Sequence, residues 1–176
     1  GKAGEAAENT SYNIKDCVNS GTVTAELSGP SIDMGGIAGW TSIPMVGSDV
    51  EKLVNKAAVS VTELAGADVN LGGVVGKSIS TFDKAYTKGD AAVTLALSEE
   101  WNKTFRVGGI AGYMSKASTG VFKQAQNYAP VTISGGASGN TNKCYVGGCV
   151  GGAESTAVTS NSTSWVTCNS NYAKIT

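Results

Sequence analysis

The chain has 176 residues, with 13 Lys and Arg residues, 14 Asp and Glu residues and no histidine, so its formal net charge is −1. A chain of this length is expected to form one domain, and its near-neutral charge, with Arg106 as the single arginine, argues against a nucleic-acid partner. No apolar run reaches the roughly 18 residues of a membrane-spanning helix, so we expect no membrane insertion.

The chain divides into a short polar segment and a repeat domain. Residues 1–12 are polar and are expected either to shield the first repeat unit or to be disordered, and no signal peptide is visible in them. Residues 13–176 are expected to form a single repeat domain of about four and a half units. The last unit is only partial, so flanking repeats of a longer chain are one expected partner.

Three short strands are expected in the first unit and at the start of the second. The first covers Val23–Leu27, which begins with a β-branched residue, and the second surrounds the glycine motif of residues 34–39. The third covers residues 50–54 and opens the second unit, with Val50 aligned to Ile14. No segment shows a helical period with caps.

The glycine motif G-G-x-x-G recurs four times at nearly constant spacing. Its first glycines lie at positions 35, 72, 108 and 147, so successive copies are 37, 36 and 39 residues apart. A fixed period in this range is typical of stacked-repeat proteins. We predict an all-β repeat solenoid, a parallel β-helix with about three short strands per unit of 36–39 residues. A β-sandwich or a β-prism is the alternative. The glycines of the motif are Gly35, Gly36, Gly39, Gly72, Gly73, Gly76, Gly108, Gly109, Gly112, Gly147, Gly148 and Gly151.

A second motif precedes each glycine motif and supplies aligned columns of residues. Asparagine recurs at a turn, where its side chain can bond its own main chain; the column holds Asn19, Asn55, Asn127 and Asn171, with Thr87 in the third unit. A small or medium apolar column, expected to point inward, holds Cys17, Leu53, Ala85, Ala125 and Cys168. A β-branched column that starts the next strand holds Val23, Val59, Val93, Val131 and Ile175.

The two motifs together resemble the GLUG repeat, whose consensus joins a G-G-[LI]-V-G core to an N-C-x-N-x-G-x-V segment. Residues 14–39 match this consensus best, and the resemblance extends over residues 14–176, with Thr87 and Pro130 as departures. The resemblance implies a secreted or surface-attached bacterial protein, such as an adhesin or the non-catalytic part of an immunoglobulin A peptidase. It therefore implies an extracellular or cell-surface location, and it supplies no catalytic residue.

The four cysteines are interpreted as core residues, because each aligns with apolar residues in the other units. A disulfide among Cys144, Cys149 and Cys168 is feasible in an oxidising compartment. Cys17 lies several coils away from them and is expected to stay free, since a disulfide needs Cα atoms within about 7 Å. Without histidine or a C-x-x-C pair, no metal site and no cofactor are expected.

A catalytic role is the less favoured reading. Histidine, the usual general base at neutral pH, is absent, and the carboxylates are scattered over turns. Asp33 and Asp68 are aligned as near-equivalents before two glycine motifs. A polysaccharide lyase or glycoside hydrolase built on a β-helix is the alternative. A cleft with two carboxylates about 5–10 Å apart would favour this enzyme.

The favoured reading is a binding surface for a host or environmental glycan or protein. Trp40, Lys77 and Tyr113 directly follow the first three glycine motifs, and Gly152 follows the fourth, so they are expected to form one stripe. Tyr128 and Tyr172 are equivalent across two units and form a second candidate stripe. Aromatic rings suit the apolar faces of sugar rings. The competing reading is that these rings cover the glycine-rich strands. A purely structural stalk is a further possibility.

Overall fold

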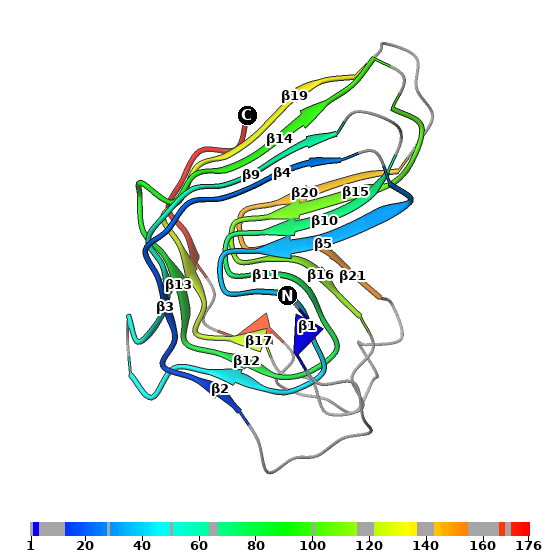
Figure 1. The fold of residues 1–176 in the computed structure, drawn as a ribbon. Helices are drawn as coiled ribbons and strands as arrows, with labels where there is room; N and C mark the ends of the chain where they lie inside the picture. The colour runs from blue at the N-terminus through cyan, green and yellow to red at the C-terminus, as the bar shows by residue number, and fades with distance from the viewer. Residues whose placement is uncertain are drawn as a thin grey trace.

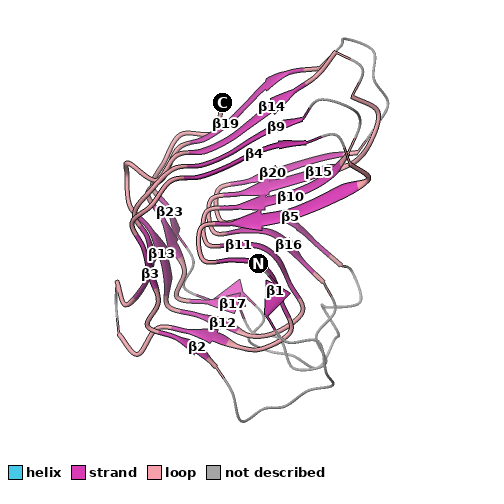
Figure 2. Ribbon diagram, in the orientation of Figure 1, coloured by secondary structure: helices cyan, strands magenta, loops and turns pink. Residues whose placement is uncertain are grey.

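A computed structural model describes residues 2–3, 13–27, 29–49, 51–63, 67–99, 101–115, 122–136, 143–154, 166–167 and 170–176. These residues form strands and turns and contain no helix (Figure 2). Every strand pairing is parallel, and strands from successive units stack above one another in five sheets. The protein is therefore an all-β, parallel β-solenoid, as predicted (Figure 1).

Each unit passes through the five sheets in the same order, which we number I to V. Sheet I contains β2 (Ile14–Lys15), β7 (Met45–Val46), β12 (Phe82–Asp83), β17 (Phe122–Lys123) and β22 (Val166–Thr167). Sheet II contains β3 (Val18–Asn19), β8 (Leu53–Asn55), β13 (Ala85–Thr87), β18 (Gln126–Asn127) and β23 (Ser170–Asn171). Sheet III contains β4 (Val23–Leu27), β9 (Val59–Glu63), β14 (Val93–Leu97) and β19 (Val131–Gly135).

The last two sheets of each unit carry the glycine motif. Sheet IV contains β5 (Ser31–Gly35), β10 (Asp68–Gly72), β15 (Phe105–Gly108) and β20 (Cys144–Gly147). Sheet V contains β1 (Lys2–Ala3), β6 (Ala38–Thr41), β11 (Val75–Ser78), β16 (Ala111–Met114) and β21 (Val150–Ala153). Each unit thus has five strands rather than about three, because the glycine motif joins two strands and because sheet I adds a short strand that the sequence did not predict. The strand expected at residues 50–54 is β8, which begins at Leu53.

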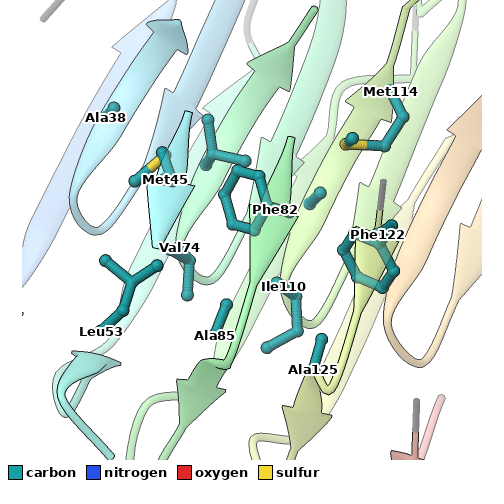
Figure 3. Packing of buried hydrophobic residues seen from close by; sticks show 12 residues of the cluster. Ala38, Met45, Leu53, Val74, Phe82, Ala85, Ile110, Met114, Phe122 and Ala125 are labelled. Carbon is teal, nitrogen blue, oxygen red and sulfur yellow. The ribbon is translucent and has the colours of Figure 1, made fainter. Parts of the chain in front are cut away.

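The five sheets give each coil an S-shaped path. Sheets III, IV, V and I follow one another as layers, and sheet II closes one side (Figure 1). One apolar core lies between sheets III and IV; it includes Val61, Leu71, Leu95 and Val107. The other lies among sheets V, I and II. Its buried members include Met45, Leu53, Phe82 and Phe122 (Figure 3).

The glycines of the repeat allow sheets IV and V to meet backbone to backbone. A Cβ placed on Gly72 would lie 2.0 Å from the Val75 carbonyl oxygen, and one on Gly76 would lie 2.1 Å from the Met34 nitrogen. A Cβ on Gly109 would lie 2.1 Å from Cγ of Asn127 in sheet II. The motif glycines do not have positive φ, so close packing and not an unusual backbone conformation requires them.

The strand register confirms most of the predicted columns. Val59 pairs with Val23 and Val93, Asn55 pairs with Asn19 and Thr87, and the first glycines of the motifs pair with one another. Ile14, however, pairs with Met45 and not with Val50. The reason is that residues 47–52 separate β7 from β8, whereas only residues 16 and 17 separate β2 from β3. The second unit therefore carries an insertion at this point.

The asparagine ladder, which is the column Asn19, Asn55, Thr87, Asn127 and Asn171, closes each coil between sheets II and III. Nδ2 of Asn127 donates to Oδ1 of Asn171 and to the Ala129 carbonyl oxygen, both at 2.8 Å, and Oδ1 of Asn127 accepts from the Ala129 N–H at 3.1 Å. Asn55 and Asn127 are fully buried. Since a buried amide without partners costs about 1–3 kcal/mol, the ladder both fixes the turn and satisfies its own polar groups.

The N-terminal segment contributes one described strand. In β1, Lys2 pairs with Trp40 and Ala3 with Thr41, so this strand extends sheet V on the side of the first coil. Residues 4–12 lie outside the described part of the chain.

Candidate binding surface

The predicted stripe after the glycine motifs forms a continuous column in sheet V. Lys77 pairs with Trp40 on one side and with Tyr113 on the other, and Tyr113 pairs with Gly152. We call these four residues the sheet V column. Its members are half-buried rather than fully exposed.

A second column faces it from sheet IV. Asp33, Asn70, Arg106 and Tyr145 pair with one another in successive coils, and we call them the sheet IV column. Nδ2 of Asn70 donates to Oδ1 of Asp33 at 2.7 Å, and a guanidinium N–H of Arg106 donates to Oδ1 of Asn70 at 3.2 Å. This corrects the alignment of Asp33 with Asp68, because Asp68 pairs with Ser31.

The two columns meet at Arg106. Its Cζ atom lies 4.2 Å from the centre of the Tyr113 ring and 5.6 Å from that of Tyr145. Nζ of Lys77 lies 5.7 Å from the Tyr113 ring centre. A Cβ on Gly152 would lie 2.9 Å from Cδ of Arg106, so the missing side chain leaves room for the arginine to lie against sheet V. Burial raises the pKa of the Tyr113 hydroxyl, and its hydrogen bond to the Glu154 carboxylate raises it further.

The sheet IV column was missed from the sequence, although a signal was present. Its members are the middle residues of the apolar-x-apolar triplets that precede each glycine pair. In the sequence these middle positions read Asp, Asn, Arg and Tyr, which share no chemistry that would mark them as a column.

The second predicted stripe is a stacked pair on a different part of the molecule. Tyr128 and Tyr172 follow the asparagine ladder at the end of sheet II, with ring centres 4.7 Å apart and planes 9° apart. They are 40% and 62% exposed. The Tyr128 hydroxyl donates to Oε1 of Gln126 at 2.9 Å, and Tyr86 in the same sheet is buried, which raises its pKa. We call Tyr128 and Tyr172 the tyrosine pair.

Several carboxylates are engaged in contacts that join adjacent coils. Asp16 accepts from the Ser48 N–H at 2.6 Å and the Ser48 hydroxyl at 2.7 Å, and these bonds hold the pKa of Asp16 below its usual value. Asp68 accepts from the Thr104 N–H at 2.8 Å, and Asp83 pairs with Lys123 at 3.3 Å. Within the described ranges, no group of three or more His, Cys, Asp or Glu side chains is placed to hold a metal ion.

The described cysteines occupy the predicted columns. Cys17 and Cys149 pack against the core among sheets V, I and II, and Cys144 pairs with Phe105 in sheet IV but is exposed. The Cys17 thiol is free, as expected, and contacts the Lys15 carbonyl oxygen at 3.4 Å. Burial raises the pKa of Cys149. Cys168 lies outside the described residues, so the predicted pairing with it stays a prediction.

Comparison with known proteins gives no match to a family model, to a curated protein or to a solved structure. The resemblance to the GLUG repeat therefore stays a prediction. Among the described residues, no helix is long and apolar enough to cross a membrane.

Proposed function

We propose that the chain is a non-catalytic binding module of a secreted or surface-attached bacterial protein, with a glycan or protein as its ligand. The observation that carries this proposal is the alignment of aromatic side chains at the same register in successive coils. The tyrosine pair presents two parallel, exposed rings, and the sheet V column sets Trp40 and Tyr113 on either side of Lys77.

The chemistry of these columns supports a repetitive ligand. Aromatic rings contact the apolar faces of sugars, while hydroxyl, amide and cationic groups beside them supply hydrogen bonds. Because coils repeat about every 4.8 Å, equivalent side chains recur along the stacking axis. A linear chain of sugars or an extended peptide would contact several coils at once.

The coil-bridging contacts of the carboxylates support the non-catalytic part of the proposal. Asp16, Asp68 and Asp83 each bond a neighbouring strand or turn, which is a structural role. A polysaccharide-active enzyme would instead need an acid and a base facing one substrate bond. Incubating the protein with polysaccharides and measuring released reducing ends or unsaturated products tests this alternative directly.

A stalk is the second candidate, and the asparagine ladder is the observation that favours it. The hydrogen bonds between its side-chain amides run along the stacking axis, so a force along that axis would act on many hydrogen bonds together. A stalk and a binding module are compatible in one chain, but only a binding module has a ligand.

A glycan array with the wild-type protein and two double variants tests the proposal. Tyr128→Ala with Tyr172→Ala removes the tyrosine pair, and Trp40→Ala with Tyr113→Ala removes the rings of the sheet V column. We expect specific ligands whose signal falls in one of the two variants. Unchanged binding in both variants would contradict the proposal, as would an absence of glycan and protein ligands for the wild type.

A further inference from the structure

We propose that Arg106 and Lys77 form a binding site for an acidic polysaccharide, whose carboxylate or sulfate groups they contact. This inference rests on the proposed binding function and names the ligand class for the sheet IV and sheet V columns. It is carried by the geometry of the two cations around Tyr113, one from each sheet.

Two ring contacts and one hydrogen bond hold the guanidinium of Arg106 in place. The rings of Tyr113 and Tyr145 lie within cation–π distance, and one of its N–H groups bonds Asn70. A guanidinium has five N–H donors in one plane, so most of them stay available for a planar or tetrahedral oxyanion. Holding the group in place lowers the entropy lost when an anion binds.

Lys77 supplies a second positive charge beside the same ring. In the part of the chain that the structure describes, neither Lys77 nor Arg106 lies within ion-pair distance of a carboxylate. Lys88 and Lys123 differ in this respect, because they pair with Glu51 and Asp83. Lys77 and Arg106 are thus two half-buried cations beside one aromatic ring, without a fixed counter-charge among the described residues.

The nearby carboxylates are held by neutral groups. Asp33 lies two coils from Arg106, and Asn70 stands between them with a hydrogen bond to each. Glu154 accepts the hydrogen bond of the Tyr113 hydroxyl. These contacts fix the carboxylates relative to the cations and leave the ammonium of Lys77 and the remaining N–H groups of Arg106 for a ligand.

The register sets the direction of the ligand. Trp40, Lys77 and Tyr113 follow one another along the stacking axis at about 4.8 Å per coil. A polysaccharide lying along this axis would place a sugar face against Trp40 and an acidic group near Lys77 and Arg106. A neutral polysaccharide would gain only the aromatic contact.

Affinity electrophoresis with polygalacturonate, heparin and dextran tests this site. The carboxylate of polygalacturonate and the sulfate of heparin distinguish the two oxyanions, and dextran is the neutral control. We expect retardation by at least one acidic polymer, and a loss of affinity of about tenfold in Arg106→Gln and in Lys77→Gln. Lys88→Gln is the matched control, because it removes the same charge from an ion-paired lysine that follows β13, away from the sheet IV and sheet V columns. Thermal unfolding of each variant checks that the fold is kept.

The possible failures separate the two proposals. If Lys88→Gln weakens binding as much as Arg106→Gln does, the polymer is attracted non-specifically to positive side chains and the proposed site is wrong. If the glycan array identifies ligands that need the aromatic rings but neither acidic polymer is retained, the acidic site is wrong and the binding module stands. If no ligand is found by either method, both proposals fall.

Discussion

The asparagine ladder and the sheet IV column are both single columns of polar side chains that run through successive coils, yet they differ in composition. The ladder repeats asparagine in four of its five positions and is fully buried at Asn55 and Asn127. The sheet IV column changes at every step, from aspartate to asparagine, arginine and tyrosine. A repeated residue solves a packing problem that recurs in every coil. A changing residue is free of that constraint, so its column is where a ligand can be recognised.

The largest effect is expected where the repeated residue has no room to change. Gly72→Ala places a Cβ 2.0 Å from a backbone oxygen, and backbone cannot yield as a flexible side chain can. We expect a loss of about 3 kcal/mol or more in the free energy of unfolding, measured by urea denaturation. Gly89→Ala is the control, because its Cβ would have no neighbour closer than 4.0 Å. Equal stability of the two variants would contradict the close contact of sheets IV and V.

The asparagine ladder should show the next largest effect. Asn127→Ala removes a buried side chain that bonds Asn171, Thr87 and both polar groups of Ala129. The variant takes this hydrogen-bond acceptor from the buried Thr87 hydroxyl and this donor from the buried Ala129 carbonyl oxygen. We expect a loss of about 2–3 kcal/mol in unfolding free energy. Asn171→Ala, at an exposed position of the same ladder, should cost under about 1 kcal/mol. Similar losses in both would show that burial does not set the value of the ladder.

A substitution in the sheet IV column should change stability little and ligand affinity strongly, unlike a substitution in the asparagine ladder. Arg106→Gln removes a half-buried side chain that makes one hydrogen bond and two ring contacts, so we expect a change of under about 1 kcal/mol in unfolding free energy. Affinity for an acidic polymer should fall by about tenfold. A large loss of stability in this variant would place Arg106 with the ladder as a structural residue.

The smallest effect is expected at a corner that neither column uses. Asp16, Glu51, Lys84 and Gln124 have positive φ between sheets I and II, a conformation that favours glycine. Gln124 is exposed, with φ of 52°. Gln124→Gly should therefore stabilise the protein by up to about 1 kcal/mol, read as a small rise in the thermal midpoint. A fall in the midpoint would mean that the glutamine contributes contacts that outweigh its backbone strain.

The repeated residues were predictable from the sequence, since the same packing problem selects the same residue in every coil. The glycine, asparagine and valine columns follow from the period alone, and the register confirms them. The insertion at residues 47–52 was not predictable in the same way. Val50 stands three residues before Leu53, as Ile14 does before Cys17, so the sequence pattern favours the wrong partner.

The contact between the sheet IV and sheet V columns depends on the path of the coil. Arg106 and Tyr113 lie on opposite sides of the glycine motif, and they meet only because the chain reverses there. Local pattern indicates which residues point to the same side of a strand, but it does not show which sheet that side will face. The columns were therefore predictable one at a time, and their pairing was not.

The most direct test of this account is the affinity of Arg106→Gln for the acidic polymer that the wild-type protein binds, measured beside that of Lys88→Gln. We predict a loss of about tenfold for Arg106→Gln, little change for Lys88→Gln, and thermal midpoints close to the wild type for both. Wild-type affinity in Arg106→Gln, or an equal loss in the two variants, would contradict the assignment of the changing column to ligand recognition.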